Sequence, residues 1–573
     1  MATAAAEARL HPYSDRLRRV LSARTLIVGL VAAAIAYLAL VPLGFLLWQT
    51  FVANGALTLD RFREAYDTVG LGEMALNSLT FAFGSTLLAL ALGTALAYLI
   101  VRTDVPLKPF MFAASLVPLI IPGVLHTIAW IFLASPQIGI VNRNFLSPVF
   151  GVSFDVFSLP GMIFVEGVHL APLVFLLMVA SFRSMDPALE EAAIMSGARL
   201  PTVLRRVTIP LSRPALYAAA LIMVVRGLES FEVPALLGLP GGVWVFTSRI
   251  WRVLKDIPPS YGQAGALAMS LLVLTSVGVL LYSRLTKRAR AYQTVTGKGF
   301  RPRPVDLGVW RWPAAVLILL YFGIAVLLPV AILMYASTQP FYTPPSRYTV
   351  SHMNLDAYHE VIHSDLFSLA VKNSLILGLG SATTVMLLTA VAAWVVVRTE
   401  LPGRWLIDNL AFLPLIVPGL VLGVAILYVY LRVPLPIYGT LWILFMAYLT
   451  RYMPYGMRYA STSMFQIGRE LEESALTSGA SWFQSFRRVV MPLLAPGLVA
   501  GWIYILIVSV RELSSTIIVY SPGKEVLSIA IWEMYQNGEL PQLAALGMMM
   551  VGALAVLVAV AYRLGARIGV RES

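Results

Sequence analysis

Two polar segments of the chain repeat the same spacing of glutamate, glycine and proline, with alanine one or two residues after the glutamate. The positions are Glu191, Ala192, Gly197 and Pro210 in the first segment, and Glu473, Ala475, Gly479 and Pro492 in the second. Glutamate near a helix start suits the helix dipole, glycine between two short helices permits a sharp turn, and proline is expected to stop the second helix. The spacing predicts such a pair of helices over 189–211 and again over 471–493. An ordinary amphipathic surface loop is the alternative, but it does not account for two copies in register.

A second group of charged residues lies within, or at the ends of, long apolar runs. It consists of Arg226, Glu229, Glu232, Arg511 and Glu512, together with Glu166 and His169. Ionisable groups at membrane depth are costly and usually face a bundle interior or a water-filled path. These residues are expected either to line a translocation path or to form structural ion pairs around the two arginines, and the sequence leaves both open. His126 is interpreted as a packed polar residue rather than a ligand.

The sequence gives no indication of a metal site or of catalysis. The chain contains no cysteine, which excludes disulfides and thiolate ligands. His359 and His363, with His352 nearby, would share a helix face as metal ligands often do, but a solvated loop helix explains them better. An ATP-binding loop needs Gly-x-x-x-x-Gly-Lys-Ser/Thr, and neither Gly-Lys pair of the chain fits. The chain is therefore not expected to be an enzyme.

The composition excludes an ordinary soluble protein. Of the 573 residues, 59% are hydrophobic and only 12% are charged, whereas a soluble protein needs charged side chains over most of its surface. Apolar runs of about 20 residues recur without period-2 alternation, which predicts membrane-spanning helices rather than a barrel. Twelve spans are expected, at 25–51, 76–101, 109–134, 157–181, 214–236, 263–283, 312–336, 372–397, 406–431, 438–460, 494–519 and 541–563.

Basic residues set the expected orientation of these spans. The segment 284–311 is rich in Lys and Arg and contains a single acid, Asp306. By the positive-inside rule this linker is cytoplasmic, and so is the Arg-rich N-terminal segment 1–24. Twelve spans then place both termini in the cytoplasm and the loop 337–371 outside. The net charge of +13 has the same origin, so no nucleic-acid partner is expected.

The two halves of the chain are copies of each other. Asn77-Ser78-Leu79 recurs as Asn373-Ser374-Leu375, and Val101-Arg102-Thr103 recurs as Val397-Arg398-Thr399, both at an offset of 296. The polar segments recur at an offset of 282. Because both copies start and finish on the same side, the repeat is parallel. We therefore expect a first domain over 25–283, the linker 284–311, and a second domain over 312–573.

The duplicated polar segments resemble the EAA loop of the permeases of type I ABC importers. The resemblance covers both halves, and it implies an all-α integral membrane protein of the bacterial inner membrane, built as two six-helix permease domains. It implies that each loop forms a coupling helix, which docks on one of two copies of a separate ABC ATPase. ATP and magnesium would bind to that ATPase, with no cofactor in this chain, and a periplasmic binding protein would deliver the solute.

Three further stretches are similar to the ferric-iron class of these permeases. They are Phe231–Leu236, Arg511–Thr516, and the run from Ser135-Pro136 to Asn142. This similarity implies ferric iron as the cargo, with thiamine, phosphonate and polyamine as alternatives. A proton-coupled secondary transporter and a non-transporting scaffold are the rivals from other classes, and neither explains the duplicated loops.

Overall fold

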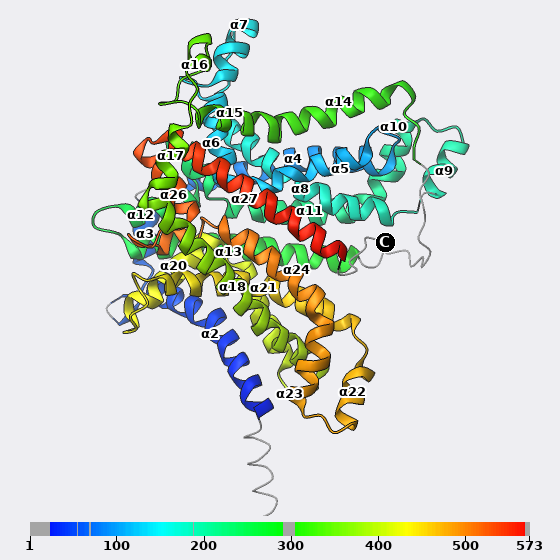
Figure 1. The fold of residues 1–573 in the computed structure, drawn as a ribbon, viewed down its shortest axis with the longest axis vertical. Coiled ribbons are helices and arrows are strands. Elements are labelled where there is room, and N and C mark those ends of the chain that lie inside the picture. The colour runs from blue at the N-terminus through cyan, green and yellow to red at the C-terminus, as the bar shows by residue number, and fades with distance from the viewer. Residues whose placement is uncertain (1–22, 54, 68–69, 187, 290–303, 568–573) are drawn as a thin grey trace, which may run out of the picture. The chain divides into compact units, whose positions relative to one another are not determined.

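The computed structural model describes residues 23–53, 55–67, 70–186, 188–289 and 304–567. The predicted N-terminal segment 1–24 lies almost entirely outside this part of the chain, as do residues 290–303 of the predicted linker. Regular structure in the described residues is helical, apart from an isolated bridge and the short antiparallel pair β1 (Val52–Ala53) and β2 (Ala56–Leu57). The predicted all-α class is therefore confirmed (Figure 1).

The chain divides into two compact units, each containing most of one repeat. The first-repeat unit comprises residues 50–368 and 528–555, and the second-repeat unit comprises the residues up to 49, 369–527, and those from 556 onward. This division differs from a simple cut at the linker, because helix α2 (Ala23–Phe51) groups almost entirely with the second-repeat unit. The boundaries 25–283 and 312–573 remain predictions about the sequence repeat.

Long apolar helices make up most of the first-repeat unit. Its helices are α3 (Asp60–Asp67), α4 (Leu71–Arg102), α5 (Lys108–Leu116), α6 (Gly123–Ala134), α7 (Ser147–Phe150), α8 (Leu159–Ser184), α9 (Ala188–Met195), α10 (Leu200–Val203), α11 (Ile209–Glu229), α12 (Phe246–Lys255), α13 (Tyr261–Ala289), α14 (Arg311–Phe322), α15 (Leu328–Ala336), α16 (Arg347–Ser351) and α17 (Asp356–His363), with most of α26 (Leu527–Asn537) and part of α27 (Leu540–Arg567).

The second-repeat unit repeats the order of the central helices. After α2 it contains α18 (Asp365–Arg398), α19 (Arg404–Phe412), α20 (Gly419–Arg432), α21 (Leu441–Gln466), α22 (Arg469–Thr477), α23 (Trp482–Ser485), α24 (Met491–Val510) and α25 (Thr516–Val519). By the repeat offsets, α18 corresponds to α4, α21 to α8, and α24 to α11.

Nine helices in the described residues are long and apolar enough to cross a membrane, and two bent pairs raise the number to eleven. The chain is therefore a multi-pass membrane protein. The remaining predicted span, 438–460, corresponds to α21, which is long enough at 26 residues. However, α21 carries Arg451 and Arg458, and it is not among the apolar helices.

Two of the predicted spans are sharply bent. The predicted spans 109–134 and 406–431 each consist of two helical pieces that meet at 97° and 109°, respectively. The bends lie at Pro122 and Pro418, where the preceding residues, Ile121 and Val417, are extended. Proline disfavours helical geometry in the residue before it, which explains the break. The pieces after the bends, α6 and α20, are almost entirely buried.

Close contacts of α4 and α18 with the helices beside them depend on glycine. A Cβ atom at Gly93 of α4 would lie 2.6 Å from both the carbonyl oxygen of Ala171 and the Cβ of Val174 in α8. The positions equivalent to Gly93 and Val174 are Thr389 of α18 and Gly456 of α21. A Cβ atom at Gly456 would lie 2.9 Å from Thr389 Oγ1. The tight contact is thus kept in both units, with the glycine on the opposite helix.

The same exchange occurs where these helices meet α11 and α24. A Cβ atom at Gly227 of α11 would lie 2.9 Å from the Cα of Ala82 in α4. In the second-repeat unit, the equivalent positions are Ser509 of α24 and Gly378 of α18. A Cβ atom at Gly378 would lie 3.1 Å from Ser509 Oγ.

Candidate functional site

The first polar segment folds as two short helices joined by a tight glycine turn. Helix α9 ends before Gly197, whose φ of +83° is in the left-handed region that favours glycine. The N–H of Gly197 donates to Ile194 O at 2.9 Å, and the N–H of Ala198 donates to Ala193 O at 3.0 Å. These bonds close the end of the helix as in a Schellman motif, and the chain then enters α10.

The second polar segment has the same geometry. Helix α22 ends before Gly479, whose φ is +87°. The N–H of Gly479 donates to Leu476 O at 3.0 Å, and that of Ala480 donates to Ala475 O at 3.1 Å. Ser481 then caps α23 by accepting from the N–H of Gln484. The glycine turn that the sequence predicts is present in both segments.

The expectation that proline stops the second helix of each segment is wrong. Pro210 and Pro492 lie in the first turn of α11 and α24, and the apolar helices run on as Leu200–Glu229 and Trp482–Val510. A π-helical turn precedes each proline, over Leu204–Thr208 and Phe486–Val490. Proline removes an N–H and its ring clashes with the carbonyl four residues earlier, and the wider turn accommodates both effects.

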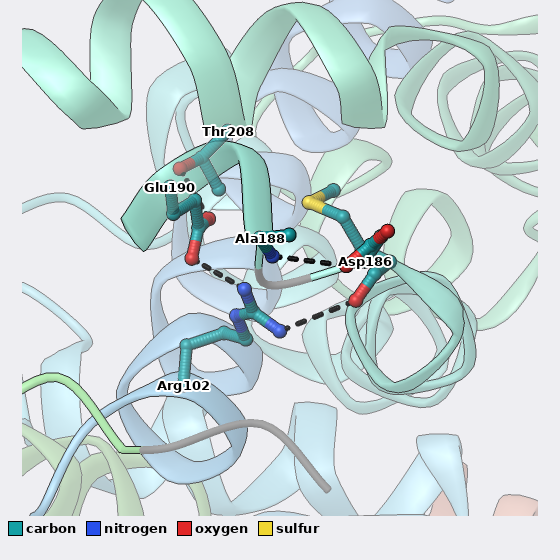
Figure 2. Close-up of polar contacts among 6 residues, drawn as sticks. Arg102, Asp186, Ala188, Glu190 and Thr208 are labelled. Carbon is teal, nitrogen blue, oxygen red and sulfur yellow. Dashed lines mark hydrogen bonds and ion pairs between the residues drawn. The ribbon is translucent and has the colours of Figure 1, made fainter. Parts of the chain in front are cut away.

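A buried ion pair attaches the first segment to the end of α4. Glu191, the predicted motif residue, is exposed, but its neighbour Glu190 is buried and faces Arg102 (Figure 2). The guanidinium of Arg102 donates to Glu190 Oε2, and the two side chains are only 1% and 5% exposed. Thr208 Oγ1 donates to the other carboxylate oxygen at 2.6 Å. Glu190 therefore connects α4 and the π-helical turn to the polar segment.

An equivalent but looser contact holds the second segment. Arg398 Nε lies 3.9 Å from Glu472 Oε2, with the side chains 7% and 12% exposed. The indole N–H of Trp394 donates to Glu472 Oε1 at 2.8 Å. Arg398 also donates to Ile467 O at 2.5 Å. Glu473, the predicted motif residue, is exposed like Glu191.

Sequence reasoning missed Glu190 and Glu472, although a signal for them was present. Arg102 and Arg398 are charges at equivalent ends of apolar helices, so each requires a partner or water. Both glutamates immediately precede the motif glutamates at the 282 offset. Two acidic residues in succession point about 100° apart on a helix, so one of each pair faces inward.

The outer surfaces of both segments carry exposed apolar side chains. They are Leu189, Ile194 and Met195 in the first segment, and Leu471, Leu476 and Phe483 in the second. In the second segment, a hollow of about 340 Å³ is lined by Ala475, Gly479, Gln484 and Arg488, among others. Apolar side chains beside a polar hollow are typical of a surface that a partner protein covers.

The predicted path residues of the first-repeat unit lie around the end of α11. This helix ends at Glu229, and a short break separates it from Glu232. Arg226 pairs with Glu229 at 3.9 Å, as the structural interpretation expects. The carboxylate of Glu232 packs against Gly123 at the start of α6, where a Cβ atom would lie 1.9 Å from its Oε2. Glu166 is buried and accepts from Ser230 Oγ at 3.0 Å.

The equivalent break in the second-repeat unit contains Arg511 and Glu512. Arg511 caps the end of α24. Glu512 Oε1 accepts from both the N–H and the Oγ of Ser515 at 3.0 Å, and its other oxygen accepts from Tyr452 OH at 3.3 Å. Each repeat therefore has a carboxylate hydrogen-bonded to a hydroxyl at this break.

The histidines do not form a metal site in the described residues. His126 is buried beside His169, with ring centroids 5.2 Å apart, which agrees with its interpretation as a packed side chain. His359 and His363 stack on the exposed face of α17. His363 Nδ1 lies 2.8 Å from His359 O, within the helix.

Comparison with known proteins gives one family match in each repeat. Residues 85–291 and 367–571 match the family described as "Binding-protein-dependent transport system inner membrane component". A ferric transport system permease of Actinobacillus pleuropneumoniae is 23% identical over 417 residues, which cover 72% of this chain and 60% of that protein. An Fe(3+)-transport system permease of Haemophilus influenzae is 23% identical over 467 residues, covering 81% and 84% of the two chains.

A third relative corresponds to a single repeat. A Salmonella typhimurium protein assigned to 2-aminoethylphosphonate transport is 28% identical over 262 residues. The match covers 45% of this chain but 94% of that protein. The chain thus spans about 60% of the length of the Actinobacillus protein.

Proposed function

The chain belongs to the family of binding-protein-dependent transport system inner membrane components, and we propose that it is a permease of an ATP-driven importer, with two six-helix halves in one chain. The observation that carries this proposal is the duplicated polar segment. Each copy has a left-handed glycine turn, exposed apolar side chains and a buried arginine–glutamate pair at its base. A loop that only connects two helices would not need these three features, and their presence in both repeats points to a shared role.

The two segments are the proposed coupling helices, and each would dock on one copy of a separate ABC ATPase. Glu191, Ala192, Gly197 and Pro210 form the first coupling site, and Glu473, Ala475, Gly479 and Pro492 form the second. ATP and magnesium would bind to the ATPase, and this chain would hold no cofactor. In this proposal α21 is the twelfth span, because Arg451 donates to Val417 O within the protein rather than facing lipid.

In the proposed orientation the coupling helices, both termini and the linker are cytoplasmic, and residues 337–371 face a periplasmic binding protein. Two features support it. The exposed side chains of the two π-helical turns include the pairs Arg205-Arg206 and Arg487-Arg488, as expected for the cytoplasmic side. The loop after α15 contains no comparable cluster of basic residues.

The proposed cargo is ferric iron, since two relatives that match 72% and 81% of the chain are named for ferric transport. The 2-aminoethylphosphonate relative supports phosphonate as the alternative; thiamine and polyamine rest on the sequence resemblance alone. Arg226, Glu229, Glu232, Arg511 and Glu512 would lie along the path. Glu229 pairs with Arg226, Glu512 accepts hydrogen bonds from Ser515, and the Glu232 carboxylate lies against the start of α6.

The coupling role is tested by replacing the turn glycines. Valine at Gly197 and Gly479 strains a left-handed backbone by roughly 1–2 kcal/mol per site. The double variant Gly197→Val, Gly479→Val is expected to keep its fold but to lose uptake per ATP hydrolysed by the assembled transporter. Gly151→Val is the matched control, because Gly151 also has a positive φ of +66° and open space around it, outside both segments. Normal uptake by the double variant at wild-type expression would refute the coupling assignment.

The path role is tested by uptake normalised to assembled transporter for Glu229→Gln, Glu232→Gln and Glu512→Gln. A path residue lowers uptake per molecule, whereas a structural residue lowers the amount of assembled transporter. Competition by ferric citrate and by 2-aminoethylphosphonate in the same assay separates the two proposed cargos. Unchanged specific uptake in all three variants removes these acids from the path.

A further inference from the structure

Helix α4 is attached to other segments at both of its ends. Near its first turn, Asn77 Nδ2 donates to Trp244 O at 3.4 Å, and Ser78 Oγ accepts the N–H of Phe246 at 3.1 Å. Phe246 is the first residue of α12, so Ser78 satisfies an N–H that has no partner within its own helix. At its last residue, Arg102 holds Glu190 of the first polar segment.

Helix α18 has the same two attachments. Asn373 Nδ2 donates to Glu525 O at 2.8 Å, and Ser374 Oγ accepts the N–H of Leu527 at 2.9 Å. Leu527 is the first residue of α26, just as Phe246 is the first residue of α12. At its last residue, Arg398 contacts Glu472 of the second polar segment. The Asn-Ser repeat found in the sequence therefore marks a hydrogen-bonded anchor that both units preserve.

The body of each helix is suited to carry a displacement along its length. Neither α4 nor α18 contains an internal proline. The helices that adjoin the polar segments all do, at Pro172 in α8, Pro214 in α11, Pro454 in α21 and Pro496 in α24. Proline removes a helical hydrogen bond and permits a kink, so α4 and α18 are expected to be stiffer than these four neighbours. From Ser78 to Arg102 the distance is about 36 Å at a rise of ~1.5 Å per residue.

We propose that α4 and α18 are struts that set the position of each coupling helix according to the position of the segment held at the opposite end. Asn77 and Ser78 in one repeat, and Asn373 and Ser374 in the other, are the positioning residues for this link. The proposal rests on the proposed function for its physiological meaning, because it would connect the side that meets the binding protein to the side that meets the ATPase. Its structural content, a link along each strut between the residues bonded at its two ends, stands independently.

The anchors bond main-chain atoms of the held segment, so the link does not depend on that segment's side chains. At the C-terminal end of each strut, an arginine side chain contacts a glutamate carboxylate of the polar segment. A strut held at one end only would transmit nothing, because the free end would move alone. Both ends must therefore be intact for one end to report on the other.

The test uses cysteine labels, since the native chain has none. Ser196→Cys and Ser478→Cys place single labels at equivalent exposed positions just before the two glycine turns. In the purified full-length protein, the rate of reaction with a soluble maleimide is measured at each label. Ser78→Ala is expected to change the rate at position 196 by at least about twofold and to leave position 478 unchanged. Ser374→Ala is expected to do the reverse.

Two controls separate a strut from general loosening. Ser78→Thr retains the hydroxyl acceptor and is expected to restore the native rate, provided that the thermal unfolding of all variants remains cooperative. In a protein that already carries Arg102→Gln, adding Ser78→Ala should not change the maleimide reaction rate at position 196 any further. The strut is then already detached from the polar segment. Equal changes at both labels, or no change at either, overturn the proposal.

The same variants distinguish this inference from the proposed function. In transporter reconstituted with its ATPase, detached anchors should lower binding-protein-stimulated ATP hydrolysis at least about twofold while the basal rate is retained. If the anchor variants change the maleimide rates but even the native chain shows no stimulated ATP hydrolysis, the strut proposal stands and the importer proposal is rejected. If the native chain shows stimulated ATP hydrolysis but the anchor variants leave the maleimide rates unchanged, the importer proposal stands and the strut proposal is rejected.

Discussion

The two repeats reach the same close helix packing with the small residue on opposite partners. Gly93 of α4 faces Val174 of α8, whereas the equivalent pair in the second-repeat unit is Thr389 of α18 facing Gly456 of α21. The contact between α11 and α4 shows the same exchange. What both copies retain is the short separation between helices, which van der Waals packing requires in a membrane, and not the residue at either position. Close packing therefore constrains the combined size of the two facing residues and not either residue alone.

The arginine–glutamate pairs differ between the repeats in another way. Arg102 and Glu190 are in direct contact and almost fully buried, with Thr208 completing the carboxylate's partners. Glu472 receives its hydrogen bond from Trp394 instead, and its distance to Arg398 is longer. Each glutamate thus has two side-chain partners, but the charge pair of the first repeat is closer and more deeply buried. Loss of a single arginine should therefore have unequal consequences.

The largest effect is expected for Arg102→Gln. It leaves Glu190 buried without its counter-charge, which typically costs about 3–5 kcal/mol of folding free energy. Arg398→Gln is expected to cost less, because Glu472 lies farther from its arginine and is more exposed than Glu190. Thermal unfolding of the purified variants in detergent gives the comparison. Equal destabilisation by the two substitutions would show that the separation and burial of the charge pair do not set its cost.

An intermediate effect is expected when the glycine exchange is broken. Gly93→Val places two methyl groups where even a Cβ atom is too close, at a cost of about 1–3 kcal/mol. Adding Val174→Gly transfers the glycine to α8, as in the second-repeat unit, and should recover most of the lost stability. Gly552→Val in α27 is the control, since nothing lies within 4 Å of that position. Failure of the second substitution to rescue the first would contradict the pairwise constraint.

The smallest effect on folding is expected for the motif glutamates. Glu191→Gln and Glu473→Gln change exposed side chains and should alter the unfolding free energy by no more than about 0.5 kcal/mol. Glu190→Gln and Glu472→Gln, one residue earlier, should destabilise clearly because these carboxylates face buried partners. Measured by the same unfolding assay, the four variants separate the structural glutamate of each pair from the one available to a partner. Similar losses for all four would erase that distinction.

Local rules explain which features could be predicted from the sequence. The turn at Gly197 and Gly479 follows from glycine's access to the left-handed region, and the helical class follows from the apolar runs. The rule for proline failed at Pro210 and Pro492 because its outcome depends on the winding of the preceding turn. Likewise, the bends at Pro122 and Pro418 depend on neighbours that bury α6 and α20.

The residues of the candidate site that sequence reasoning missed are those fixed by tertiary contact. Whether Glu190 or Glu191 points inward depends on the rotation of α9 about its axis, which is set by where α4 ends. Arg102 could be recognised as a buried charge in need of a partner, but not matched to a residue 88 positions away. The anchor function of Asn77-Ser78 was hidden for the same reason, because its partners are main-chain atoms that leave no trace in composition.

The paired π-helical turns bear on the history of the chain. A π-helical turn closes over one more residue than an α-helical turn, so it corresponds to a single-residue insertion within a helix. Leu204–Thr208 and Phe486–Val490 stand at equivalent places, each ahead of a proline. An insertion at the same place in both copies is the pattern expected if it preceded the duplication that produced them. Present-day relatives built from one repeat are expected to carry the same extra residue at this position.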